Sequence, residues 1–284
     1  MRPSLLPGAV VVGVDGSSGG DVALAWAAGY AHFAGRRLVV VNVADDRGPS
    51  DTDADRAVTD RALAMVEQRQ PSVRVSALDV VGDPRAVLVD LGRDASALVV
   101  GSRGRGPLAS LLLGSVSVAL AAHPPCPLVV ARPQAYAVAA VDLSVVVGVD
   151  ADGDAADALT LGFELAAAHY RPLQVVHAQG APSLFPCPDV VGSDLLTRSL
   201  DAARDVLDQR LAGYDDKFPD VQVHRRVVQA TPTQALVAAS QTASSVIVGC
   251  RGRRTVSSHV LGSVSRGVVE RAHSTVLVVG RTGS

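Results

Sequence analysis

The 284-residue sequence has little of several residue types, and each shortage excludes a class of protein. Lys217 is the only lysine and does not stand in a Gly-Lys-Ser/Thr tripeptide, which excludes a P-loop NTPase. Phe, Tyr and Trp together make up 3% of the residues, so Val, Leu and Ala must build the core. That composition favours a buried parallel sheet covered by alanine-rich helices.

Cysteines and long apolar runs are scarce too. Cys126, Cys187 and Cys250 are too few and too scattered for a disulfide framework or a four-ligand zinc site, so we expect reduced thiols. No stretch approaches the roughly 18 to 20 apolar residues of a membrane-spanning helix. The apolar run at residues 5–14 lacks a signal-peptide cleavage site. With a net charge of −2, nothing favours nucleic acid or anionic membrane as a partner, and we expect a cytoplasmic protein.

The chain contains one pattern twice. Val-Val-Val-Gly-Val-Asp, Val-Gly-x-Arg-Gly-Arg and Leu-Gly-Ser-Val-Ser recur in the same order and with closely matched spacing, at residues 10–15, 100–105 and 113–117 and again at 145–150, 248–253 and 261–265. This predicts a tandem duplication, with one domain over residues 1–137 and a second over 138–284. The linker at 132–142 is short, so we expect the two domains to pack together.

Each copy alternates between strand and helix patterns. Apolar, β-branched runs predict strands at residues 9–14, 38–43, 73–80, 97–100 and 128–131, and again near 144–149, 173–178, 221–228, 245–248 and 276–279. Strands that alternate with helices form right-handed β-α-β units, so the sequence predicts an α/β fold with a parallel sheet.

A glycine-rich loop follows the fourth predicted strand of each copy. Gly101-x-x-Gly104 is followed by nine residues and then Gly114-Ser115; the second copy repeats this spacing from Gly249. Glycine lets backbone N–H groups approach an anion closely, and the helix that begins at Gly-Ser attracts phosphate through its free N–H groups and dipole. Asp15 and its repeat at the end of strand one can accept hydrogen bonds from a ribose or an adenine amine across the cleft.

These motifs resemble the universal stress protein family, in the tandem-domain form common in actinobacteria, and the resemblance covers nearly the whole chain. ATP-binding members of that family carry Gly-x-x-Gly, nine residues and Gly-Ser/Thr, and both copies match. The resemblance implies two flavodoxin-like domains of the adenine nucleotide alpha hydrolase-like type. Each would hold a five-stranded parallel sheet of order 3-2-1-4-5 with helices on both faces. It also implies ATP as the cofactor, with Mg²⁺ bound through the phosphates and no metal site in the protein itself.

The motif and the resemblance together give candidate nucleotide-contacting residues. In the first copy they are Gly13, Asp15, Val43, Gly101, Arg103, Gly104, Arg105, Gly114, Ser115 and Val116. In the second copy they are Gly148, Asp150, Ala178, Gly249, Arg251, Gly252, Arg253, Gly262, Ser263 and Val264. Ala178 stands where the first copy has Val43. The smaller side chain would make less contact with adenine, which predicts weaker nucleotide binding at the second site.

The pattern points to binding rather than catalysis. It contains no Ser-His-Asp arrangement, metal-ligand cluster or paired general acid and base. We expect an ATP-binding regulator of stress adaptation or growth, where the link to stress comes from the resemblance alone. A slow ATPase and a sensor of AMP or cyclic AMP stay open as alternatives on the same site. Besides the nucleotide, the expected partners are the other copy in an intrachain pseudo-dimer, a second chain in a homodimer, and an unidentified regulatory protein.

Overall fold

The computed structural model describes residues 7–44, 52–104, 113–133, 143–150, 155–179, 191–250 and 261–280. The first copy holds β1 (Val10–Val14), α1 (Ser18–Phe33), β2 (Leu38–Ala44), α2 (Thr52–Arg69), β3 (Val75–Val81), α3 (Pro84–Gly92), β4 (Ala97–Gly101), α4 (Ser115–Ala122) and β5 (Leu128–Ala131). The second copy holds β6 (Ser144–Gly148), α5 (Ala156–Ala168), β7 (Leu173–Gln179), α6 (Val191–Leu211), α7 (Tyr214–Lys217), β8 (Val223–Gln229), α8 (Pro232–Ala239), β9 (Ala243–Gly249), α9 (Ser263–Arg271) and β10 (Thr275–Val279).

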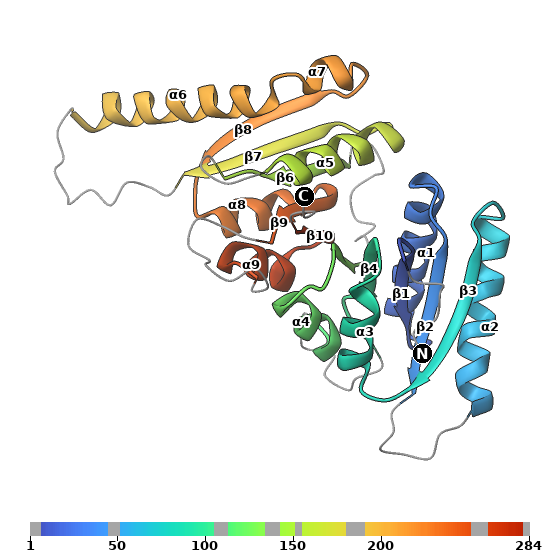
Figure 1. Ribbon diagram of the computed structural model, residues 1–284. Helices are drawn as coiled ribbons and strands as arrows, with labels where there is room; N and C mark the ends of the chain where they lie inside the picture. Colours follow the sequence, from blue (N-terminus) through green and yellow to red (C-terminus); the bar gives the residue numbers. More distant parts are fainter. Residues whose placement is uncertain are drawn as a thin grey trace.

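All strands join one ten-stranded sheet of order β3-β2-β1-β4-β5-β10-β9-β6-β7-β8. Within each copy the strands are parallel and follow the order 3-2-1-4-5, which confirms the predicted α/β fold. The two copies meet at the centre, where β5 and β10 pair antiparallel with Leu277 opposite Val129. In Figure 1 the first copy, from blue to green, meets the second, from yellow to red, where α4 lies beside α9.

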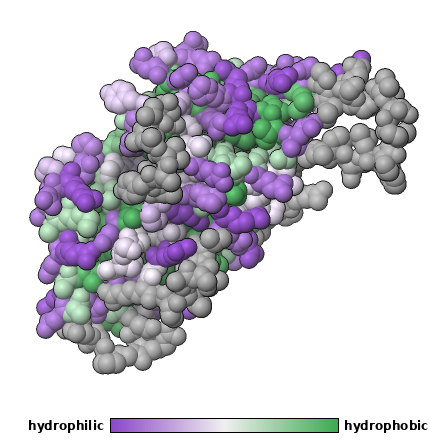
Figure 2. All heavy atoms as spheres, turned by 180° about the vertical axis from the view of Figure 1, so that it is seen from behind, coloured by the Kyte–Doolittle hydropathy of each residue, from purple (hydrophilic) through white to green (hydrophobic). Residues whose placement is uncertain are grey.

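Helices cover both faces of the sheet, as right-handed crossovers in two directions require. On one face Leu24 of α1 and Val66 of α2 belong to a core that α5 and α6 continue in the second copy. On the other face Leu88 of α3 and Leu120 of α4 belong to a core that α8 and α9 continue. Because these helices pack on the sheet largely through Ala, Val and Leu, the core needs few aromatic residues. Figure 2 shows mostly hydrophilic residues over the described part of the far face.

The third strand of each copy begins two residues later than predicted. Val73 and Val221 are buried, which is why they resemble strand residues, but each lies in the turn that follows a helix. The amide of Val73 donates to the carbonyl of Gln70 at 2.9 Å, and that of Val221 donates to the carbonyl of Phe218 at 3.1 Å. Among the described residues, none of the helices is long and apolar enough to span a membrane.

Candidate functional site

The carboxyl ends of β1 and β4 lie side by side because these strands pair, with Val12 opposite Val99. Asp15 follows β1, and the loop from Gly101 to Gly104 follows β4. A Cβ atom added at Gly104 would clash with Oδ2 of Asp15. The structure therefore brings together the carboxylate and the glycine that the sequence predicts as neighbours in one site, and it explains why this position is glycine.

The amino end of α1 packs directly on the same loop. A Cβ atom at Gly101 would lie 2.5 Å from the carbonyl oxygen of Gly19, and one at Gly19 would clash with the carbonyl oxygen of Arg103. These backbones touch only because two glycines face each other. Gly19 was absent from the predicted site, and its signal in the sequence is the Gly-Gly pair in the first turn of α1.

Asp15 is held by the residue that caps α1. Its Oδ1 accepts hydrogen bonds from the backbone amide of Ser17 at 3.0 Å and from the Ser17 hydroxyl at 2.5 Å. The Ser17 hydroxyl oxygen in turn accepts from the amide of Gly20 at 3.1 Å. The hydroxyl of Ser17 thus caps the helix, while the carboxylate of Asp15 orients that cap and reaches toward Gly104.

The helix that follows the loop begins without a side-chain cap. Gly114 is the N-cap residue of α4, and its amide donates to the carbonyl of Ser102 at 2.7 Å. Helical hydrogen bonding begins with Val118, whose amide donates to the carbonyl of Gly114 at 3.0 Å. The amides of Ser115 and the next two residues point along the helix axis toward the loop, as first-turn amides do. Such a helix start attracts an anion.

The second copy repeats this arrangement bond for bond. The amide of Gly262, the N-cap residue of α9, donates to the carbonyl of Cys250 at 2.9 Å, and no side chain caps α9 in the described part of the chain. The hydroxyl of Ser265 donates to the carbonyl of Gly249 at 2.5 Å, as Ser117 does to Gly101 at 2.6 Å. The two serines lock each helix to its strand, and their place in the repeated Leu-Gly-Ser-Val-Ser segment is the sequence signal for them.

The remaining candidates fall into four groups. Gly13 and Gly148 lie against helix side chains, since added Cβ atoms would stand 3.1 Å from Leu88 and 2.7 Å from Leu236. The half-buried candidates are Val43, Val116, Asp150, Ala178 and Val264, while Arg103 and Ser263 are partly or fully open to solvent. Arg105, Arg251, Gly252 and Arg253 lie outside the described residues.

The strand-two ends differ between the copies beyond the predicted exchange of valine for alanine. Next to Val43, the buried Asn42 side chain donates to the backbone carbonyl of Asp55 at 3.4 Å. Next to Ala178, the ring of His177 is hydrogen-bonded through Nδ1 to the carbonyl of Val149 at 2.9 Å. The first copy therefore ties its second strand to α2, and the second copy ties it to the first strand.

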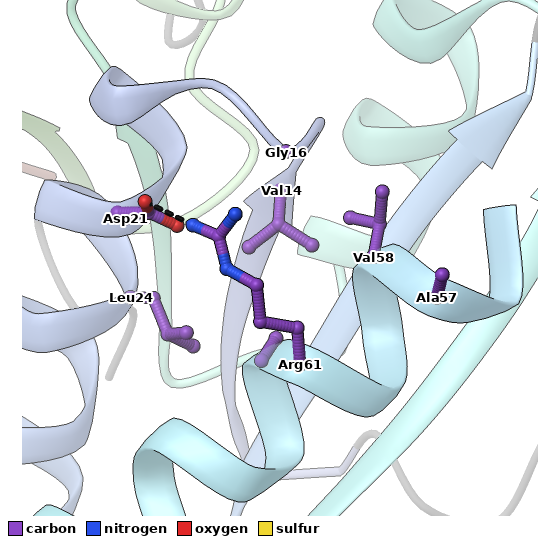
Figure 3. Close-up of a pocket in the computed structure, with 8 residues that line it drawn as sticks. Val14, Gly16, Asp21, Leu24, Ala57, Val58 and Arg61 are labelled. Carbon is purple, nitrogen blue, oxygen red and sulfur yellow. Dashed lines mark hydrogen bonds and ion pairs between the residues drawn. The ribbon is translucent and has the colours of Figure 1, made fainter. Parts of the chain in front are cut away.

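A small hollow lies beside Asp15, between α1 and α2. Its volume is about 280 Å³, and its lining residues are Val14, Gly16, Asp21, Leu24, Ala57, Val58, Arg61 and Ala62. Figure 3 shows the ion pair between Asp21 and Arg61 across this hollow. Ligand pockets span roughly 300 to 1,000 Å³, so this hollow is at the lower limit for a small molecule. Among the described residues there is no group of three or more His, Cys, Asp or Glu that could hold a metal ion.

The fold and the loops define a class: a tandem doubly wound α/β protein with a glycine-loop site at the carboxyl end of each half-sheet. Both halves match the model of the universal stress protein family, over residues 8–132 and 144–280, and the chain belongs to that family. A universal stress protein of Mycobacterium tuberculosis is 31% identical over an alignment of 288 positions that covers 95% of each chain. One of Mycobacterium bovis is 32% identical over an alignment of 286 positions that covers 95% of this chain and 96% of that protein.

A solved structure supports the fold over the full length. A universal stress protein of Archaeoglobus fulgidus aligns with a TM-score of 0.65 over 96% of this chain and 98% of its own. The two sequences are 22% identical, so the likeness is one of fold.

Proposed function

We propose that each copy binds ATP, with Mg²⁺ carried on its phosphates, and that the protein acts in the cytoplasm as a nucleotide-dependent regulator of stress adaptation or growth. The observation that supports this most is the start of α4 and α9 on glycine. Helices α1, α3 and α8 are capped by Ser17, Asp83 and Thr231, whereas α4 and α9 have no side-chain cap in the described residues. Helices α5 and α7 also lack such a cap, but only α4 and α9 follow the glycine loops. Open amides at the two loops suit phosphate oxygens.

The residues around the loop fit the other parts of the nucleotide. The carboxylate of Asp15 can accept from ribose hydroxyls, and it stands against the glycine loop that would hold the phosphates. Val43 is half-buried at the end of β2 and can contact the adenine ring. Gly101 and Gly104 leave the loop without side chains at its closest approaches to α1 and Asp15.

The contact between the copies supports a regulatory role. The segment that leads into α9 is hydrogen-bonded to the end of α4 through Leu261 and Ala122. Nucleotide at one loop therefore acts on a helix end in the other copy. This couples occupancy to the packing of the two halves, and packing is what a partner protein can sense.

Replacing both N-cap glycines by aspartate tests the proposal. The backbone at Gly114 (φ −74°, ψ 156°) and Gly262 (φ −64°, ψ 156°) suits any residue, and a Cβ at Gly114 meets its neighbours at 3.6 Å or more. The new carboxylate would take up the open amides and repel phosphate, while it caps the helix well. We expect ATP affinity in calorimetry to fall by at least about tenfold, equivalent to ~1.4 kcal/mol.

The matched control is the double variant Gly114→Ala and Gly262→Ala, which adds a Cβ atom without charge and should keep most of the affinity. A folded aspartate double variant that binds ATP as tightly as the wild type would contradict the proposal.

A slow ATPase and a sensor of AMP or cyclic AMP are the alternatives on the same site. No general base stands beside the loop among the described residues apart from Asp15, whose carboxylate is engaged by Ser17. Phosphate release slower than about 1 per second is therefore expected, and a faster rate would favour an enzyme. The nucleotide that copurifies with the protein distinguishes ATP from AMP and cyclic AMP.

A further inference from the structure

Arg132, the first residue after β5, is a buried cation. Its exposed fraction is 8%, and none of the described carboxylates forms an ion pair with it. Its Nη2 donates to the carbonyl of Val269 in α9, and its backbone amide donates to Oγ1 of Thr275 at 3.2 Å. Nη1 is buried and has no hydrogen-bond partner in the described part of the chain. A buried guanidinium that is only partly paired costs free energy.

Arg132 lies at the base of the first glycine loop. The carbonyl of Ala131 accepts from the amide of Ser102 at 2.8 Å, so the chain leaves β5 directly beside the loop. The guanidinium of Arg103 in that loop is close enough to act on Arg132. Burial, and after it the charge of Arg103, lower the pKa of Arg132 to about 10. Arg103 itself is exposed, and a buried cation that lies near a second cation is stabilised by an anion that both can contact.

The start of α4 lies at the same end of the interface between the copies. α4 and α9 are neighbours, and the amide of Leu261, just before α9, donates to the carbonyl of Ala122 at the end of α4. The two helices therefore run antiparallel, and the last turns of α9 lie near the first turn of α4. Arg132 bonds to Val269 in those last turns of α9. The carbonyl that accepts from Arg132 thus lies in the part of α9 that is nearest to the start of α4.

The second copy has no such residue. The amide of Cys250 donates to the carbonyl of Val279 at 2.9 Å, as Ser102 does to Ala131, so Gly280 occupies the position of Arg132. The hydrogen bond to the carbonyl of Val269 in the other copy gives Nη2 of Arg132 a partner. It does not explain why Nη1 is buried without one in the described part of the chain. Ser274 Oγ is the other buried polar atom without a partner among the described residues, but a water molecule can satisfy a hydroxyl and cannot offset a charge.

We propose that Arg132 binds the terminal phosphoryl group of the ligand in the first-copy site, together with Arg103 and the open amides of α4. The first site then selects a polyphosphate chain over a monophosphate, and the second site, with Gly280, does not. That the ligand is a nucleotide rests on the function proposed above. The role of Arg132 rests on its own burial and its unpaired Nη1, and inorganic polyphosphate has the same chemistry.

The test uses the full chain carrying Gly262→Asp, so that the second site is blocked and calorimetry reports the first. ATP, AMP and inorganic tripolyphosphate are titrated into this protein and into its Arg132→Met variant. A hydrogen bond to a charged group predicts a loss of roughly 10- to 100-fold for ATP and tripolyphosphate, with AMP affinity unchanged. Arg132→Lys keeps the charge and should lose less. Arg69→Met, at an exposed position in α2, is the matched control.

Unchanged ATP affinity in Arg132→Met, or an equal loss for ATP and AMP, would overturn the inference, because Arg132 would then act only through packing. The two proposals can fail separately. If the parent protein binds neither ATP nor AMP but binds tripolyphosphate in an Arg132-dependent way, the nucleotide proposal fails and the role of Arg132 stands.

Discussion

The backbone amide of Leu261 donates a hydrogen bond to the carbonyl oxygen of Ala122 at 3.1 Å, and this bond joins the two copies. A second bond between the copies runs in the other direction, from the guanidinium of Arg132 to the carbonyl of Val269 in α9. Each bond ties the site region of one copy to the far end of the other copy's helix. Because each of those helices begins at its own loop, the two sites and two helices form a closed path of contacts.

Leu261→Ala should weaken these contacts between the two copies. Leu261 is buried, and truncation of a buried leucine costs about 2 to 4 kcal/mol in the free energy of unfolding. Hydrogen exchange should also quicken at the end of α4, in the copy that does not carry the substitution. Val118→Ala in α4 is the control, because Val118 is exposed and its truncation should change little. If exchange quickens only in the second copy, the contact does not carry the effect of the substitution to the first copy.

Gly19→Ala and Gly29→Ala should have opposite effects although both lie in α1. A Cβ at Gly19 would clash with the carbonyl of Arg103, so we expect a loss of about 1 to 3 kcal/mol in the free energy of unfolding. A Cβ at Gly29 meets nothing within 4 Å, so alanine there should stabilise the helix by roughly 0.5 to 1 kcal/mol. Denaturant unfolding of both variants checks the pair. Equal changes in the free energy of unfolding of the two variants would mean that the start of α1 does not pack tightly on the loop.

The repeated β-α-β units made the two parallel sheets predictable, whereas the strand order 3-2-1-4-5 was implied by the resemblance to the family. The contact of Gly19 with Gly101 was not predictable, since it depends on β1 pairing with β4 across more than eighty residues of chain. Asp15 near Gly104 was predictable only because both motifs end strands at one edge of the sheet.

Arg132 illustrates a different limit of prediction from the sequence. An arginine before Pro133 reads as the start of a polar linker, and the linker was expected to begin there. In the structure the residue is buried, because the neighbouring copy covers the end of β5 and supplies the acceptors. A residue buried by another domain carries no local signal of burial in its own segment.

Ala178→Val should strengthen the second site. Ala178 lacks two methyl groups that Val43 presents at the equivalent strand end, and at about 0.8 kcal/mol per CH₂-sized group the deficit reaches roughly 1 to 1.5 kcal/mol. That is near tenfold in ATP affinity. The reciprocal variant Val43→Ala should weaken the first site by a similar factor. Calorimetry that finds two equal sites in the wild type, and no response to either change, would refute adenine contact at this position.

The first copy alone should form a two-fold dimer. β5 (Leu128–Ala131) is buried along its whole length, and β10 of the second copy covers its edge through antiparallel pairing. Without β10, this apolar edge would pair with another strand, and a second β5 can replace β10 in the same antiparallel register. Residues 1–135 contain a complete match to the family model over 8–132, so this fragment can be tested by itself.

Sedimentation should give the mass of two fragments, and the amides of β5 should be protected from exchange. A fragment that stays monomeric at high concentration, with freely exchanging β5 amides, would show that this edge does not drive the association of the copies.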